Sequence, residues 1–391
     1  MSGGRVRSVE TFIITLPRDT PYLGDLRPGE EVNSQGYFVR QGNRTVYSVS
    51  DRTVIVRVMT EDGIEGWGET YGLAAPRATV EIIKNLLAEF VIGRDPLDAP
   101  AIHDDLYDLM RVRGYTGGFY LDALAALDIA LWDAAGKTAG LPVAKLVGGG
   151  ARRSTIPAYV SGLPKPTRAE RASLAKEWQG RGYSAFKFAS PVAEDGIAAE
   201  MGSLREALGP AARIACDMHW THSADEAISL IRRMEQHDLW FAEAPVRTED
   251  LDGLARVARS VSSAIAVGEE WRTVFDAAQR VGREACAIVQ PEIGHTGITE
   301  FMRIGLYAQA HHLRVMPHAT IGLGIFLAAS LQASAALGAV VCHEFQHSIF
   351  EPNRRYLTGD MDCQGGHYVV PTGTGLGVEP SEEARRLFLA V

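Results

Sequence analysis

The sequence has few cysteines, and their spacing neither suits a metal site nor suggests a disulfide framework. Only four occur in 391 residues, no two of them form a CxxC pair, and they are Cys216, Cys286, Cys342 and Cys363. A chain of this length can bury a core without covalent cross-links. We therefore expect free thiols, a reducing compartment, a cytoplasmic location and no zinc site.

Positive charge is also scarce. Lysine and arginine together number 39 against 48 aspartates and glutamates, which gives a formal net charge of -9. No cluster of basic and aromatic residues offsets the resulting repulsion from a phosphate backbone. No GxGxxG motif follows a strand pattern and no GxSxG motif is present. We expect a small-molecule partner, with no nucleic acid, dinucleotide cofactor or serine nucleophile.

Apolar runs of membrane length are rare as well. The opening "MSGGRVRSVE" contains no apolar region typical of a signal peptide, so we expect none. One uncharged stretch, residues 320–342, is long enough for a bilayer. It is rich in glycine, alanine and serine, contains Gln332, and lacks the aromatic or basic flanks that anchor a membrane helix. It predicts a buried helix followed by a buried strand, and no membrane partner.

The first 150 residues combine strand and helix patterns. Residues 51–70 alternate apolar and polar side chains on both sides of Asp62-Gly63, which is a strong hairpin signal. Residues 122–137 follow a helical period with leucines on one face, and Gly136 near the end acts as a stop signal. An antiparallel α+β region is therefore predicted.

From residue 156 onward, short apolar segments alternate with helical patterns, as in βα units around a parallel sheet. The strand candidates are "IPAYV", "SAFKFA", "RIACDMH", "LWFAEAP", "AIAVGEE", "AIVQPE", "LRVMPH" and "AVVCHE". Eight such strands in succession favour a closed barrel.

An ionisable residue stands at the end of seven successive strand candidates, one βα unit apart. These residues are Lys187, Asp217, Glu243, Glu269, Glu292, His318 and Glu344. Any one of them alone could be a helix cap or a solvated loop residue. The carboxyl ends of barrel strands meet at one mouth, where barrel enzymes hold their chemistry, so the shared register favours a functional site.

Asp217, Glu243 and Glu269 follow three neighbouring strands and would bring three negative charges together in a dry mouth. An oxygen-only ligand set suits Mg²⁺ better than zinc. The alternative is a structural cluster paired with lysine or arginine. A cation with a lysine and a histidine beside it suits proton removal next to a carboxylate, which produces an enediolate.

Several segments carry a resemblance to a known family. They are "GWGET", "ALDIALWDAAGKTAGLPVAKLVGG", "CDMH", "AEAP", "GEE", "QPEIGHTGIT", "PHATIGLGI" and "GTGLGV". The chain resembles the mandelate racemase-like branch of the enolase superfamily along nearly its whole length. The resemblance implies an α/β fold: an α+β capping domain with an active-site lid at 1–150, a modified (β/α)₇β barrel at 151–362, and a segment at 363–391 that returns to the capping domain. It also implies a homo-oligomer.

The resemblance assigns roles to individual residues. Asp217, Glu243 and Glu269 match the three Mg²⁺ ligands of the family. His318 matches the histidine base of the seventh strand, and Glu292 occupies the place of its carboxylate partner, which is usually an aspartate. The longer glutamate arm could still hold the imidazole by a hydrogen bond.

Three further positions separate the reactions of the branch. Glu344 matches the acid that meets the substrate carboxylate or the enediolate. Lys187 matches the first lysine of a Lys-x-Lys motif whose second position is Ala189, so the opposed bases of the racemases are not available. His219, which on a strand would share a face with Asp217, resembles the acid of D-galactonate and galactarate dehydratases that expels hydroxide.

We therefore expect a Mg²⁺-dependent dehydratase that converts an aldonate or aldarate into a 2-keto-3-deoxy acid. The alternatives are an epimerase, racemase or lactone cycloisomerase with the same enediolate chemistry, or a non-catalytic metal-binding barrel.

Residues 18–50 form a long polar connection typical of a lid, and their arginine, asparagine and tyrosine content suits even a doubly acidic substrate. His295, beside the mouth, could contact substrate or cap a helix.

Overall fold

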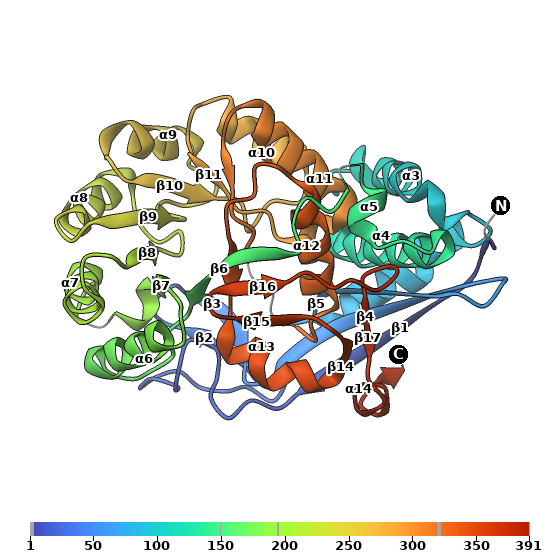
Figure 1. The fold of residues 1–391 in the computed structure, drawn as a ribbon, viewed down its shortest axis with the longest axis horizontal. Coiled ribbons are helices and arrows are strands. Elements are labelled where there is room, and N and C mark those ends of the chain that lie inside the picture. The colour runs from blue at the N-terminus through green and yellow to red at the C-terminus, as the bar shows by residue number, and fades with distance from the viewer. Residues whose placement is uncertain (1–3, 149, 194, 319–321, 391) are drawn as a thin grey trace.

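The structure, a computed structural model, describes residues 4–148, 150–193, 195–318 and 322–390. Part of the "PHATIGLGI" segment, residues 319–321, lies outside the described residues, as do the first two positions of the long apolar run. Figure 1 shows a helix-ringed barrel with an α+β region packed against one side of it.

The α+β region contains an antiparallel sheet in the order β18-β1-β4-β5, with β1 (Val6–Leu16), β4 (Asp51–Thr60), β5 (Glu65–Tyr71) and β18 (Leu389–Ala390). The β4–β5 pairing confirms the predicted hairpin. The helical segments are α1 (Pro76–Ile82), η1 (Ile83–Leu87), α2 (Ala88–Val91), η2 (Pro96–Asp98), α3 (Ala99–Arg111), α4 (Gly118–Ala139) and α5 (Val143–Leu146). Buried valines of β4 and leucines of α4 belong to one apolar cluster, so the sheet and the helix share a core.

Helix α4 differs from its prediction at both ends. It begins four residues before 122, and it ends at Gly140, whose φ of 65° forms a left-handed C-cap. Gly136 is therefore inside the helix, and the prediction that it stops the helix was wrong. A Cβ at position 136 would lie 2.6 Å from the Cα of Gly375, so glycine is required there because the C-terminal segment approaches closely.

The barrel strands are parallel to their neighbours, and β13 closes the sheet by pairing with β6. An isolated bridge between Val315 of β12 and Val340, three residues before β13, links the ends of the last two strands. The strands are β6 (Thr155–Ser161), β7 (Ala185–Ala189), β8 (Arg213–Asp217), β9 (Leu239–Glu243), β10 (Ala264–Val267), β11 (Ile288–Val289), β12 (Arg314–Val315) and β13 (His343–Phe345). All eight strand candidates are present, several shorter than predicted.

A helix stands between each barrel strand and the next, which gives the modified (β/α)₇β order and confirms the predicted fold class. The helices are α6 (Arg168–Gly180), α7 (Ile197–Leu208), α8 (Ala224–Glu235), α9 (Leu251–Ser260), α10 (Val274–Val281), α11 (Ile293–Ala310) and α12 (Ile325–Ala336). Helix α12, within the long apolar run, is buried along its whole length. No helix in the described ranges has the length and apolarity needed to cross a membrane.

The C-terminal segment joins both parts of the molecule. The hairpin of β15 (Asp362–Gln364) and β16 (His367–Val369) pairs with β6 of the barrel, and β17 (Val378–Pro380) pairs with β14 (Leu357–Gly359). Strand β18, beyond helix α14 (Glu382–Arg386), then adds to the sheet that contains β1. The end of the chain thus returns to the sheet in which it began.

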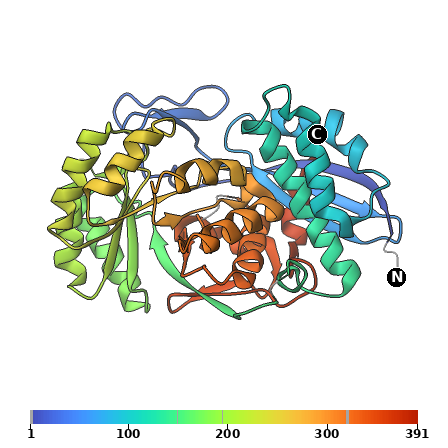
Figure 2. The same cartoon turned by 90° about the horizontal axis from the view of Figure 1, so that it is seen from above.

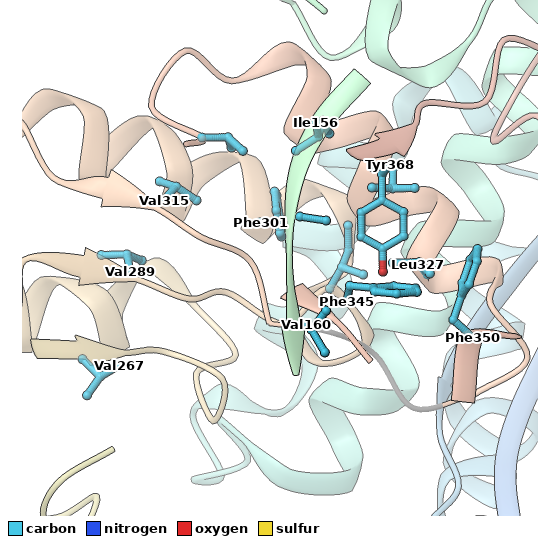
Figure 3. Packing of buried hydrophobic residues seen from close by; sticks show 14 of the residues in the cluster. Ile156, Val160, Val267, Val289, Phe301, Val315, Leu327, Phe345, Phe350 and Tyr368 are labelled. Carbon is cyan, nitrogen blue, oxygen red and sulfur yellow. The ribbon is translucent and has the colours of Figure 1, made fainter. Parts of the chain in front are cut away.

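An aromatic cluster holds the last barrel strand in place. Figure 3 shows the rings of Tyr368, Phe345 and Phe350 close together, with centroids 5.6–5.8 Å apart. Phe350 lies on α13 (His347–Asn353). The hydroxyl of Tyr368 donates to the carbonyl oxygen of Glu344 at 3.1 Å. Burial of each ring stabilises the fold by about 1.5–3 kcal/mol, and the cluster fixes the strand that carries Glu344.

Residues 18–50, which we call the lid, form a hairpin of β2 (Tyr37–Arg40) and β3 (Thr45–Ser48) with turns around it. In Figure 2 this hairpin, in blue, lies apart from the antiparallel sheet and above the green and yellow part of the barrel. Arg40 is fully buried inside the lid, with Nη1 2.7 Å from Glu30 Oε2 and Nη2 donating to the carbonyl of Tyr22. The lid is therefore an ordered unit with its own polar interior.

Candidate active site

Three carboxylates meet at the carboxyl ends of neighbouring strands. Asp217 is the last residue of β8, Glu243 the last of β9, and Glu269 lies two residues beyond β10. One oxygen from each lies within 4.8 Å of the others. The structure thus brings together the three predicted metal ligands around a common point.

The electrostatics of these carboxylates fit a divalent cation. Burial, assisted by Asp217 and Glu243, raises the pKa of Glu269 well above its usual range, although His318 opposes the shift. Burial also raises the pKa of Glu243, against the influence of Lys187. Buried like charges need compensation, and an all-oxygen donor set is the one that Mg²⁺ prefers. The residues present therefore suit such an ion.

Lys187 supplies only part of that compensation. Its Nζ lies 2.7 Å from Glu243 Oε2 and 2.9 Å from Glu344 Oε1, and its side chain is 3% exposed. Burial opposes its charge, but Glu243 and Glu344 outweigh burial and raise the pKa of Lys187 well above its ordinary value. Burial opposes the charge of Glu344, but Lys187 and His318 together outweigh burial and lower the pKa of Glu344 to about 2. Lys187 is thus a charged residue that forms ion pairs with two carboxylates at once.

His318, three residues beyond β12, is held by Glu292. The Nδ1 atom of His318 lies 2.7 Å from Glu292 Oε2, and its Nε2 atom lies 3.1 Å from Glu269 Oε2. Two donors fix the glutamate: the Tyr71 hydroxyl at 2.9 Å and the Gly294 amide at 2.8 Å. Glu292 is also the N-cap of α11, so it combines the helix-cap role with an orienting contact to the imidazole. The longer glutamate arm therefore does reach His318.

His219 reaches Asp217 by a different path from the predicted one. Strand β8 ends at Asp217, and His219 and Trp220 have φ values of 51° and 52°, so the expectation that the strand continues to His219 was wrong. In this left-handed turn the backbone amide of His219 donates to Asp217 Oδ1, and His219 Nε2 lies 2.9 Å from Asp217 Oδ2. Such a conformation is strained for a non-glycine residue, which is typical of functional sites.

The lid contacts His219 from the other side. Asn43 Nδ2 lies 3.2 Å from His219 Nδ1 and 2.9 Å from the Tyr47 hydroxyl. The orientation of the amide follows from its other end, because Asn43 Oδ1 accepts from the Thr45 backbone N–H at 3.2 Å. Asn43 therefore donates to Nδ1, which leaves the proton of a neutral His219 on Nε2.

A cavity of about 350 Å³ lies between the lid, the α+β region and the barrel mouth. Its lining residues include Tyr22, Thr45, Tyr47, Tyr71, Leu73, Phe119, Asp122, Asp217, His219, Trp220, Glu269, Glu270, Arg272, His295 and His318. Four of the residues predicted for the site are among them. The others, Lys187, Glu243, Glu292 and Glu344, are buried and contact those four or one another.

Sequence reasoning missed several residues of this site. Asn43 and Tyr47 lie in the predicted lid, but nothing in their spacing indicated a contact with His219. Gln290, two residues before Glu292, donates to Glu243 Oε2 at 2.7 Å. Its place at the end of a strand candidate was a usable signal. Asp122 begins the predicted helix of residues 122–137, and nothing in that pattern indicated a contact with the site.

The fold and the convergent carboxylates define a class, that of barrel proteins with an α+β capping domain and an acidic candidate metal site at the barrel mouth. The family described as mandelate racemase / muconate lactonizing enzyme, N-terminal domain, matches residues 42–148, and the enolase C-terminal domain-like family matches residues 170–384. The chain belongs to the mandelate racemase/muconate lactonizing enzyme branch of the enolase superfamily. It is therefore an enzyme of that superfamily.

Individual relatives carry different activities. The chain is 32% identical to D-galactarolactone cycloisomerase from Agrobacterium fabrum over 344 residues, covering 85% of this chain and 89% of that protein. It is 31% identical to D-galactonate dehydratase from Ralstonia nicotianae over 361 residues, covering 86% and 91%. A solved structure from Sinorhizobium meliloti, provisionally described as an isomerase, is 72% identical, with a TM-score of 0.98 over 99% of this chain and 100% of that one.

Proposed function

We propose that the chain is a Mg²⁺-dependent dehydratase that removes the α-proton of a sugar acid and eliminates its 3-hydroxyl to give a 2-keto-3-deoxy acid. The observation that carries the proposal is that two imidazoles, His318 and His219, border one cavity beside the same three carboxylates. One imidazole is held by a carboxylate as a base would be. The other, when neutral, carries on Nε2 the proton that an acid would give up, and in this structure that atom lies 2.9 Å from Asp217 Oδ2.

The chain's residues have separable tasks in this reaction. Asp217, Glu243 and Glu269 would hold the ion, which when bound supplies positive charge to the oxygens of the substrate carboxylate. His318 Nε2 takes the proton from the α-carbon, and Glu292 stabilises the resulting imidazolium through Nδ1. Lys187 keeps Glu243 and Glu344 ionised and in place.

The elimination balances without a co-reactant. As the Cα–H electrons form a double bond to C3, the C3–O bond breaks, and His219 Nε2 gives its proton to the departing hydroxide, which leaves as water. The enol then takes a proton at C3, gives up the proton of its C2 hydroxyl and becomes the 2-keto acid. General acid assistance by a positioned histidine contributes roughly 10²–10⁴ in rate.

Ala189 argues against inversion by a second base. It is buried in an apolar cluster with Leu23, Phe38 and Tyr47 of the lid and with Val192. A lysine at position 189 would displace these lid side chains. Racemisation by opposed lysine and histidine is therefore disfavoured by packing as well as by residue type.

The second candidate is lactone cycloisomerisation, favoured by the aromatic lining of the cavity. The lining includes the aromatic side chains of Tyr22, Tyr47, Tyr71, Phe119 and Trp220, whose apolar surface suits a cyclic substrate. A relative of the chain has this activity. In that reaction the β-leaving group is the lactone carboxylate, which departs as a stable anion and needs no acid.

Turnover of a stereochemically complete library of aldonic acids, aldaric acids and their lactones, each with Mg²⁺, tests the proposal through release of α-keto acid. We expect an open-chain acid to be dehydrated, with His219→Asn lowering that rate about 10²–10⁴-fold. Turnover of lactones alone, unchanged in His219→Asn, would establish the second candidate. Absence of turnover across the library would overturn both.

A further inference from the structure

The cavity is also lined by a second charged cluster. Asp122 lies near the start of α4, Arg272 follows β10, and His295 lies near the start of α11. All three line the cavity. We call Asp122, Arg272 and His295 the distal cluster.

Within the distal cluster the charge of Arg272 is already matched. Its Nε donates to Asp122 Oδ1 at 3.3 Å, its Nη2 lies 3.2 Å from the same oxygen, and its Nη1 donates to the carbonyl of Glu270 at 2.6 Å. The Asp122 side chain is 8% exposed. Burial opposes its charge, but His295 and Arg272 outweigh burial and lower the pKa of Asp122. Asp122 and Arg272 therefore form a buried ion pair with no net charge.

The atoms left for a ligand are hydrogen-bond acceptors. His295 Nδ1 lies 2.8 Å from Asp122 Oδ1, and the His295 ring stacks on Tyr71 with centroids 4.4 Å apart. Burial and the nearby Arg272 lower the pKa of His295. Its Nδ1 also lies 3.2 Å from Arg272 Nη2, but the shorter contact is with the Asp122 carboxylate, so the proton of a neutral ring is on Nδ1 and faces Asp122. Among the described residues, neither His295 Nε2 nor Asp122 Oδ2 has a hydrogen-bond partner. Both accept the hydrogen of a hydroxyl, and both repel a carboxylate.

No other lysine or arginine is available to bind a second carboxylate in this cavity. Arg272 is the only one among its described lining residues, and the residues outside the description include no lysine, arginine or histidine. Three of the four lid arginines have other partners: Arg18 pairs with Asp51 at 2.6 Å, Arg40 pairs with Glu30, and Arg27 donates to the carbonyl oxygen of Pro191. The fourth, Arg44, is exposed and is not among the residues that line the cavity. The lid therefore places no arginine in the cavity wall to bind a second carboxylate.

We infer that the distal cluster binds an uncharged, hydroxyl-bearing end of the substrate, and that Asp122 determines this specificity by neutralising Arg272. The substrate then carries a single carboxylate, at the end that reacts. Aldonates and lactones with one carboxylate fit this description, and open-chain dicarboxylates do not. The inference rests on the proposed function only for the position of the reacting carboxylate.

Matched pairs of acids test it: D-galactonate with galactarate, and D-gluconate with D-glucarate. We would measure kcat/KM and, by calorimetry, Kd for each acid with Mg²⁺. In the pair that is turned over faster, we expect kcat/KM of the wild-type protein to be at least tenfold higher for the monoacid than for the diacid. Asp122→Asn preserves the shape of the side chain but leaves the charge of Arg272 unpaired. It should reduce this monoacid-to-diacid ratio at least tenfold, through changes in KM and Kd. The double variant Asp122→Asn with Arg272→Gln should lose the improved binding and turnover of the diacid.

Asp104→Asn is the matched control, because Asp104 pairs with Arg303 at 2.6 Å outside the cavity, and its ratio should stay at the wild-type value. Wild-type preference for a diacid, or an unchanged ratio in folded Asp122→Asn, would overturn the inference. The wild-type ratio stands as a test even if Asp122→Asn does not fold. Monoacid binding without turnover would refute the proposed function alone, and binding of neither acid would refute both.

Discussion

Glu292 and His318, from the ends of neighbouring barrel strands, share a 2.7 Å contact that leaves only Nε2 of the imidazole directed toward the carboxylates. The contact has the geometry of a carboxylate that orients a base. The contact is present although the family usually has an aspartate at this position, because Tyr71 and Gly294 hold the longer glutamate side chain in place.

Replacing Glu292 with glutamine should reduce turnover strongly. The neutral amide cannot stabilise the imidazolium of His318, and we expect kcat to fall about 10²–10⁴-fold with KM within about threefold. Steady-state kinetics on the best substrate measure both. Glu300→Gln, on the same helix α11 and without contact to His318, should keep kcat near wild type. An equal loss in the two variants would contradict the orienting role.

Asn43 should matter for elimination and not for proton abstraction. Asn43→Asp replaces the donor to His219 Nδ1 with an acceptor. Because Nε2 already lies 2.9 Å from Asp217 Oδ2, both ring nitrogens would then face carboxylates, which retain the protons of the ring and make it a weaker acid. We expect elimination to slow about 10–100-fold while exchange of the α-proton with solvent continues. Gln41→Ala, an exposed lid neighbour, is the control. Parallel loss of exchange and elimination in Asn43→Asp would show a general disturbance of the site.

Magnesium should stabilise the folded chain through the three carboxylates. Chelation should abolish activity and lower Tm, and Mg²⁺ at about 100 times its Kd should restore about 2.7 kcal/mol of stability. Glu269→Gln should lose most of this Mg²⁺-dependent rise in Tm, whereas Glu270→Gln, one residue further on, should keep it. A similar rise in both variants, measured by thermal unfolding, would place the ion elsewhere.

His343 should make stability depend on pH. It is fully buried, with Nε2 2.7 Å from Ser330 Oγ, and burial lowers its pKa to about 4. The unfolded chain, with a pKa near 6.5, binds the proton first, so folding stability should fall as pH drops from about 6.5 to about 4, by up to about 1.4 kcal/mol per pH unit. Urea unfolding of His343→Gln across this range should show a shallower slope. Equal slopes would mean that other groups cause the dependence.

Periodic patterns predicted the barrel and its carboxylates because each ligand directly follows an apolar strand. Asp217, Glu243 and Glu269 needed only the rule that parallel strand ends converge. The turn at His219 was not predictable in this way, because its positive φ depends on contacts made after β8 ends. Asp122 and Asn43 were also beyond reach, since pairing them with Arg272 and His219 joins segments about 150 and 176 residues apart in sequence.

Solvent exchange in D₂O, followed by NMR on substrate and product with Mg²⁺ present, tests the division of labour between the two histidines most directly. We predict that His219→Asn exchanges the α-proton of the substrate but forms little keto acid, and that His318→Asn does neither. Exchange that persists in His318→Asn, or elimination at the full wild-type rate by His219→Asn, would contradict the assignment of His318 as the base and His219 as the acid.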